Sequence, residues 1–97
     1  MGIASFYANS FYGKKTASGE KLKKTILTAA HKKFPFGTIL KVTNELNKKS
    51  VIVEITDRGP FVKGREIDLS KRAFRDIARH HGYGSMKVTI EIVEEIP

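Results

Sequence analysis

The sequence predicts a mainly β protein in which five or six short strands close into a small barrel, with one helix beside them. Three observations lead to this fold class. Apolar, β-branched runs of strand length recur along the chain and are separated by Gly, Pro and Asn. A single stretch, residues 70–82, has apolar residues at helical spacing. The 97 residues, 40% of them hydrophobic, suit a single domain over residues 1–97 with one core.

The expected strands are the runs in which β-branched residues concentrate, and they cover Ile3–Tyr7, Thr38–Asn44, Ser50–Thr56 and Met86–Val93. A hairpin over Glu45–Lys49 joins the middle two, and Asn47 suits its turn. Between the first two strands lie a long Gly-, Ser- and Lys-rich loop, the short small-residue run Leu27–His31 and a turn at Pro35–Gly37.

The helix is expected to begin after Ser70, although Asp68 could also serve as its N-cap. Its apolar positions repeat at the spacing of one helical face: Ala73, Phe74, Ile77 and Ala78. Three basic residues, 79–81, suit the negative end of the helix dipole, and Gly82 supplies the stop.

The composition excludes several classes of protein. There is no cysteine, so disulfides, cysteine-ligated metals and cysteine nucleophiles are absent. No stretch approaches the roughly 20 apolar residues of a membrane span. Phosphate-binding, dinucleotide-binding and nucleophile-elbow motifs are missing, and His80–His81 lacks a second ligand pair, so we expect neither a cofactor nor a metal.

The net charge of +8 is unevenly distributed. The first fifty residues carry ten lysines and two glutamates, whereas acidic and basic residues balance in the rest. Each lysine pair could simply solubilise the surface, or the pairs could attract a polyanion. Lysine without arginine weakens the case for nucleic acid, because base recognition relies on bidentate arginine. Anionic wall polymers are the partner that we consider instead.

Asp57 is the first candidate for acid–base chemistry. It directly follows the most hydrophobic strand and precedes Arg58–Phe61, a turn. A carboxylate at the end of a strand, beside Phe61, can be partly removed from water and so become suited to proton transfer. The alternative is an Asx-type turn, in which the carboxylate accepts backbone N–H bonds.

Glu20 and His31 are the other two candidates. Glu20 ends the small-residue loop Thr16–Glu20, where the backbone could approach a ligand closely. His31 ends a small-residue run and precedes Lys32. The alternatives are an exposed surface glutamate and a hydrogen-bonded structural histidine.

Asp68 is interpreted as structural, either a helix cap or a partner for an arginine. Four aromatic residues cluster near the N-terminus beside the polar loop: Phe6, Tyr7, Phe11 and Tyr12. About half of them are expected to fill the core, and the others could stack on sugar rings or bases.

Seven motifs, read in order, resemble the rare lipoprotein A (RlpA-like) family over almost the whole chain. They are Gly2–Tyr7, Lys15–Glu20, Leu27–Lys32, Pro35–Thr38, Val42–Asn44, Thr56–Phe61 and Ile67–Ser70. The resemblance implies a small six-stranded double-psi β-barrel with one or two short helices, the fold also found in expansins. The chain departs from the usual family pattern at Phe6–Ala8 and Phe11–Gly13, positions that the resemblance assigns to the substrate groove.

The resemblance also implies a lytic transglycosylase of the cell envelope and septum that acts on peptidoglycan glycan strands, preferably those lacking stem peptides. The family's catalytic residues fall on Asp57, Glu20 and His31. Asp57 would act as general acid and later as base. Glu20 would orient the attacking group or share the proton, and His31 would hydrogen-bond one carboxylate. The expected substrate-binding residues are Tyr7, Tyr12, Ser18, Arg58 and Phe61.

We further expect a monomer with an extracytoplasmic location, its export signal lying outside this sequence. Three alternatives stay open at this point. One is a non-catalytic, expansin-like wall-binding module, and another is a hydrolase that adds water and leaves a reducing end. The third is a basic nucleic-acid-binding barrel, supported only by the net charge.

Overall fold

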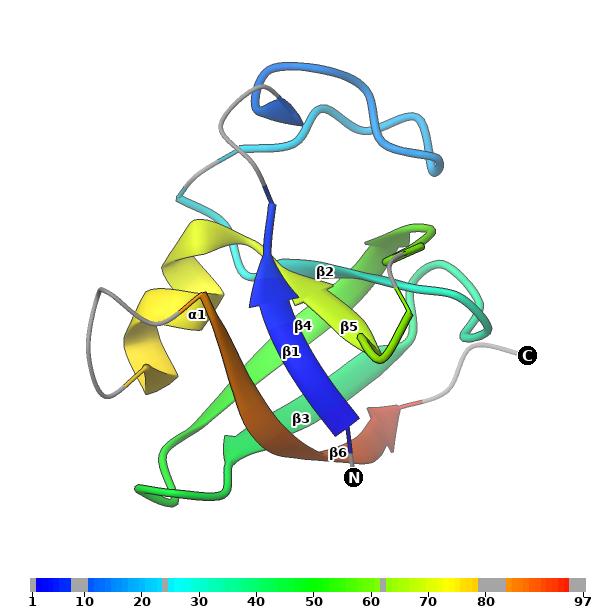
Figure 1. Ribbon diagram of the computed structural model, residues 1–97. Helices are drawn as coiled ribbons and strands as arrows, with labels where there is room; N and C mark the ends of the chain where they lie inside the picture. The colour runs from blue at the N-terminus through cyan, green and yellow to red at the C-terminus, as the bar shows by residue number, and fades with distance from the viewer. Residues whose placement is uncertain (1, 8–10, 24, 62, 79–83, 95–97) are drawn as a thin grey trace.

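The computed structural model describes residues 2–7, 11–23, 25–61, 63–78 and 84–94. Six strands and one helix are present among them (Figure 1). The strands are β1 (Gly2–Phe6), β2 (Thr28–His31), β3 (Ile39–Asn44), β4 (Ser50–Asp57), β5 (Ile67–Leu69) and β6 (Ser85–Glu94). The helix is α1 (Lys71–Ile77). The strands close into a barrel in the order β1-β5-β2-β4-β3-β6, which confirms the closed six-stranded barrel.

Two of the strand pairs are parallel and the others are antiparallel. β1 runs parallel to β5, and β2 runs parallel to β4. The register of β2 against β4 shifts between Ala29 and Ala30, so that Ala29 pairs with Ile55 and Ala30 with Asp57. This irregularity brings the last residue of β4 level with the middle of β2, where the candidate site lies.

The core fills the inside of the barrel with residues that alternate along the strands. β4 supplies Val51, Val53 and Ile55, and β5 supplies Ile67 and Leu69. The intervening residues of these strands are directed away from the core. The outer face is therefore where their polar side chains can meet a ligand.

Helix α1 begins as predicted, because the Ser70 hydroxyl accepts a hydrogen bond from the Ala73 N–H. Its end differs from the prediction: Ile77 is the last helical residue, and Ala78 is extended. The Asn44 side chain donates to the Ile77 carbonyl at 2.8 Å and ties the helix to the barrel. The predicted basic terminus, 79–81, lies outside the described residues. No helix in the described part of the chain has the length and apolarity needed to cross a membrane.

Neither β2 nor β5 was predicted as a strand, since Leu27–His31 stands out in the sequence only as a small-residue run. The shorter of the two is β5. Its three residues pair with β1 on one side and β2 on the other. The interpretation of Asp68 as a helix cap is wrong, because Ser70 caps α1. Nor does Asp68 pair with an arginine among the described residues. Its carboxylate accepts a hydrogen bond from the Ser5 hydroxyl across the β1–β5 pair.

Candidate active site

The site is built on a row of four residues that crosses four neighbouring strands. Ser5 pairs with Asp68, Asp68 with Ala30, and Ala30 with Asp57. Residues paired across a sheet share a face. The neighbours of Asp68 in β5 belong to the core, so this row lies on the outer face of the barrel.

The segment 11–23, which we call the flap, lies at the top of Figure 1 and reaches the Asp57 end of this row. It folds back on itself like a hairpin. Gly13 donates to the Leu22 carbonyl at 2.8 Å, and Leu22 donates to the Lys14 carbonyl at 2.9 Å. Gly19 closes the tip with φ +94°, a conformation that side chains other than glycine rarely adopt. The flap is therefore an ordered element, as its small and polar residues predicted.

The tip of the flap is fixed to the end of β4. Ser18 donates its N–H to the Thr56 carbonyl at 3.1 Å, and Ala17 donates its N–H to Asp57 Oδ1 at 2.8 Å. Leu22 is buried against Tyr7 and Ala30 and holds the base of the flap down. The flap thus contributes backbone donors directly to the candidate catalytic carboxylate.

Asp57 accepts three hydrogen bonds. The Ala17 and Arg58 N–H groups donate to Oδ1 at 2.8 and 2.9 Å, and the Tyr7 hydroxyl donates to Oδ2 at 2.9 Å. A backbone N–H can only donate, so Oδ1 must accept from both. Arg58 is the next residue, whereas an Asx-type turn uses the N–H two residues on, so this contact is not that turn, and the Asp57 side chain is partly exposed.

Tyr7 lies between the flap and the strands and is only 6% exposed. Its ring packs on Ala30 and Leu22. Burial, followed by the hydrogen bond and the charge of Asp57 and then the charge of Asp68, strongly raises the pKa of Tyr7. The hydroxyl therefore stays protonated and remains a donor to Asp57 throughout the physiological pH range.

Glu20 lies at the flap tip, three residues after Ala17. Its backbone carbonyl accepts from the Thr16 N–H at 2.7 Å, and its N–H donates to Ser18 Oγ at 3.5 Å. Its carboxylate is exposed and has no hydrogen bond or ion pair with any described residue. The structure places Glu20 in the same flap as the Asp57 donors, with its side chain available to a ligand.

His31 is not brought to Asp57. It pairs with the core residue Ile67, one position along β2 from Ala30, and so lies on the alternate face of the strand. Its Nδ1 accepts from the Lys33 and Phe34 N–H groups at 3.1 and 3.4 Å, and Nε2 lies 3.3 Å from Glu66 Oε1. A ring nitrogen that accepts leaves the proton on Nε2, which then donates to Glu66.

Burial is the largest cause that lowers the pKa of His31, and the charges of Arg58 and Lys33 add to it. The contact with Glu66 opposes the shift. The sequence analysis expected His31 to hold a carboxylate, and it did not single out Glu66. The sequence held one indirect signal, the glycine at position 2, since glycine within a strand often marks the close approach of another segment. In the structure that segment contains Glu66, whose Cβ would lie 2.6 Å from a Cβ at Gly2.

Arg58 ties the end of β4 to the segment after β2. Its Nη1 donates to the Phe34 carbonyl at 2.9 Å and to the His31 carbonyl at 3.4 Å. Its guanidinium lies 4.0 Å from the centre of the Phe36 ring. These contacts use Nη1 and a face of the guanidinium, so Arg58 fixes this segment, and its backbone N–H donates to Asp57.

The two remaining predicted binding residues differ in exposure. Phe61 follows the Asp57 turn and is 82% exposed, so its ring face is open to solvent. Tyr12 is half-buried at the start of the flap, where its hydroxyl accepts from the Lys71 N–H at 2.8 Å. Tyr12 also packs against the cluster that contains Tyr7, and burial raises the pKa of its hydroxyl.

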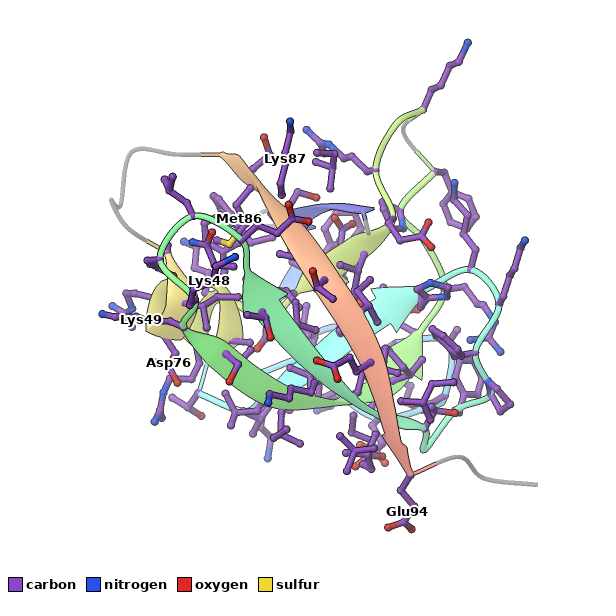
Figure 2. The ribbon with its side chains drawn as sticks, turned by 90° about the horizontal axis from the view of Figure 1, so that it is seen from below. Lys48, Lys49, Asp76, Met86, Lys87 and Glu94 are labelled. Atoms are coloured by element: carbon purple, nitrogen blue, oxygen red, sulfur yellow. The ribbon has the colours of Figure 1, made fainter. Side chains whose placement is uncertain are left out.

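The lysines that give the chain its charge do not form one face. Lys14, Lys15, Lys21 and Lys23 are exposed on the flap. Lys48 and Lys49 lie in the turn between β3 and β4, near α1, at the other end of the barrel (Figure 2). The described residues contain no group of three or more His, Cys, Asp or Glu side chains arranged to hold a metal ion.

Comparison with known sequences identifies relatives over nearly the whole chain. A family model described as "Lytic transglycolase" matches residues 1–90. A probable endolytic peptidoglycan transglycosylase RlpA of Synechocystis is 52% identical over 93 residues, 96% of this chain and 29% of that protein. The endolytic peptidoglycan transglycosylases RlpA of Pasteurella multocida and Campylobacter jejuni are each 50% identical, over 96% and 95% of this chain. The chain spans 31% and 33% of their lengths.

Solved structures with the same fold are more distant in sequence. The Streptomyces papain inhibitor matches with a TM-score of 0.74 and 21% identity, over 96% of this chain and 92% of the inhibitor. An expansin from Clavibacter michiganensis matches with a TM-score of 0.72 and 21% identity, over 99% of this chain and 50% of the expansin. The fold predicted from the motifs, a double-psi β-barrel, is confirmed, and so is the resemblance to the RlpA-like family.

Proposed function

Because the chain belongs to the lytic transglycolase domain family, we propose that it is the barrel of a peptidoglycan lytic transglycosylase that cleaves glycan strands to anhydromuramyl ends. Relatives with this name are about half identical to it over more than nine-tenths of its length. The observation that carries the proposal is the setting of Asp57. Its carboxylate is held on the outer face by three donors, which are Tyr7 just after β1, the flap and the residue that follows β4.

The reaction needs two proton transfers. A carboxyl group protonates the glycosidic oxygen as the bond to C1 of muramic acid breaks and an oxocarbenium-like centre develops. A carboxylate then takes the proton from the C6 hydroxyl of the same muramic acid, whose oxygen bonds to C1. No water is consumed, one strand ends in a 1,6-anhydro ring and the other gains a free hydroxyl. Asp57 is the centre of this chemistry, and its partner in the other transfer is Asp57 itself or a second carboxyl group.

The other site residues support Asp57. Glu20, exposed at the flap tip, orients the attacking hydroxyl or shares its proton. Tyr7 fixes Asp57 through its hydroxyl, and Ser18 anchors the flap to the end of β4 beside Asp57 and can contact the substrate there. His31 holds Glu66 and stabilises the segment that Arg58 also binds.

The surface around the site suits a polysaccharide with anionic groups. Exposed Phe61 offers a ring on which a sugar can stack, and the partly exposed ring of Tyr12 packs beside the cluster that contains Tyr7. The flap lysines surround the carboxylates with positive charge, which attracts anionic wall polymers and raises their local concentration. A peptidoglycan substrate implies an extracytoplasmic location for the barrel.

The proposal is tested by digesting purified sacculi, with and without prior amidase treatment, and identifying the products by mass spectrometry. We expect anhydromuramyl products with the parent protein and a loss of about 10²-fold or more with Asp57→Asn. Reducing-end products would instead indicate a hydrolase. Retained binding to sacculi without any product would indicate an expansin-like wall-binding module, and either result would refute the proposed activity.

A further inference from the structure

Asp68 is a second carboxyl group on the outer face of the barrel, on the same row as Asp57. Both residues pair with Ala30, one from each side. Neighbouring strands lie about 4.8 Å apart, so the two Cα atoms are separated by about 10 Å. The paired carboxyl groups of glycoside-cleaving enzymes stand about 5 to 9.5 Å apart on either side of the bond that breaks. Ala30, with a single methyl group, leaves room between the two aspartates for the Tyr7 ring, which packs on it.

The contacts of Asp68 leave it free for chemistry. Ser70 caps α1, so the helix does not need Asp68. In the described part of the chain, Ser5 is the single hydrogen-bonding partner of the Asp68 side chain. Ser5 is buried and Asp68 is partly exposed, so the carboxyl group is anchored to the barrel by Ser5 and is partly accessible to solvent.

The partners of the two aspartates suit different protonation states. Asp57 Oδ1 faces two backbone N–H groups, which can only donate and therefore match a carboxylate without a proton. Asp68 faces a hydroxyl, which donates in this structure and can equally accept from a protonated carboxyl group. Asp57 Oδ2 also faces a hydroxyl, that of Tyr7, so the two residues differ in the backbone donors alone, two at Asp57 and, among the described residues, none at Asp68. This difference is the reason for which we assign the starting proton to Asp68.

Tyr7 connects the two groups. Its ring packs on Ala30, between the aspartates, and its hydroxyl donates to Asp57. The charge of Asp68 also acts on this hydroxyl, together with that of Asp57. Both carboxyl groups therefore belong to one electrostatic site.

We propose that Asp68 is the general acid that protonates the glycosidic oxygen, and that Asp57 is the base that takes the proton from the C6 hydroxyl of muramic acid. This inference rests on the proposed transglycosylase function and divides its two proton transfers between two residues. The Asp68 proton moves to the leaving oxygen as the C1–O bond breaks. The C6 oxygen forms the new bond to C1 and releases its proton to Asp57, so that charge and atoms balance without water. Proton exchange with solvent then restores both groups.

The test compares two substrates that differ in their need for an acid. In purified sacculi the leaving group is a sugar oxygen, which must be protonated to leave. In a 4-nitrophenyl glycoside of a muramyl glycan the leaving group is 4-nitrophenolate, which leaves without a proton. We expect Asp68→Asn to lose about 10²-fold or more on sacculi and to stay within about tenfold of the parent on the aryl glycoside. Asp57→Asn, which lacks the base, should lose activity on both substrates.

Three variants complete the design. Asp76→Asn changes an exposed aspartate that pairs with Arg72 on α1, outside the site, and should behave like the parent. Asp68→Glu keeps a carboxyl group and should retain part of the activity on sacculi, which covers the case in which Asp68→Asn does not fold. Asp68→Asn loses the acid but keeps an oxygen that can accept from the Ser5 hydroxyl, whereas Ser5→Ala loses this hydrogen bond and keeps the acid. If Asp68 were merely structural, Ser5→Ala would therefore be the more damaging of the two variants.

The possible results separate the two proposals. If the parent releases no anhydro product from either substrate, the proposed function fails. If the parent is active and Asp68→Asn matches it on sacculi, the assignment of the acid is overturned. Equal losses of Asp68→Asn on both substrates, or a loss on sacculi that is larger for Ser5→Ala than for Asp68→Asn, would also overturn it.

Discussion

Replacing Tyr7 with phenylalanine removes one hydroxyl and leaves the packing of the ring on Ala30 and Leu22 in place. The hydroxyl donates to Asp57 Oδ2 at 2.9 Å, whereas the other two donors, from Ala17 and Arg58, act on Oδ1. The substitution therefore frees one carboxylate oxygen and keeps the other fixed. It tests whether Tyr7 holds Asp57 in its reactive orientation.

The magnitude follows from the type of hydrogen bond. A hydrogen bond to a charged group contributes about 1.5–3 kcal/mol. If all of it orients Asp57, its loss lowers kcat about 10- to 150-fold. Asp57 is partly exposed, so water can replace the hydroxyl in the resting protein. The free energy of unfolding should then fall by only about 1 kcal/mol, which lowers Tm by about 4–8 °C in a domain of this size.

The assay measures the initial rate of anhydromuramyl release from sacculi together with thermal unfolding of each variant. We expect Tyr7→Phe to lower the rate by more than its small loss of stability explains. In the Asp57→Asn background the same substitution should cost little further activity, because Tyr7 acts through Asp57. A rate for Tyr7→Phe within twofold of the parent would refute the orienting role.

Two further predictions concern the residues beside the site. The pKa of His31 is lowered mainly by burial, so between that pKa and the usual value near 6.5 the unfolded chain binds a proton that the folded protein does not. The free energy of unfolding of the parent should therefore decrease as the pH falls below about 6.5. In urea unfolding, His31→Gln should show a smaller decrease, by up to about 1.4 kcal/mol per pH unit. Equal slopes of this free energy against pH for the two proteins would contradict the prediction. Arg58→Lys loses the bonds to the Phe34 and His31 carbonyls and the stacking on Phe36 but keeps its N–H to Asp57. Thermal unfolding should show a loss of about 1–2 kcal/mol, and an unchanged Tm would mean that these contacts do not hold the segment.

The long strands could be predicted because their sequences carry the pattern locally. β3 and β4 are six and eight residues long, with buried and more exposed positions in alternation, and a turn with Asn47 joins them. β5 has three residues and is too short for any periodicity to identify it. Its conformation is set by pairing with β1 and β2, which lie far away in the sequence. Contacts of that kind leave no local pattern.

The site likewise contains residues that a local sequence pattern identifies and residues that only contacts distant in the sequence bring into place. Asp57 and Glu20 could be selected because each stands in a turn or a small-residue loop, and the motifs around them resemble a known family. Tyr7 was expected to bind substrate, but its role as a donor to Asp57 could not be predicted, since 50 residues separate the two. Ala17 could not be selected either, because it acts through its backbone. Glu66 resembles any exposed glutamate in the sequence, and only the packing of β1 against the start of β5 brings it to His31.

The alternation of the strands explains how so small a barrel can carry both a core and a reactive site. In β2, Ala29 packs in the main core and Ala30 packs under Tyr7 on the outer face. In β5, Ile67 and Leu69 face the core while Asp68 lies on the row beside Ala30. Any side chain larger than alanine at position 30 would lift the Tyr7 ring away from the strands and pull its hydroxyl from the Asp57 carboxylate. Ala30 therefore contributes no functional group, yet its small size sets the distance at which Tyr7 meets the two aspartates.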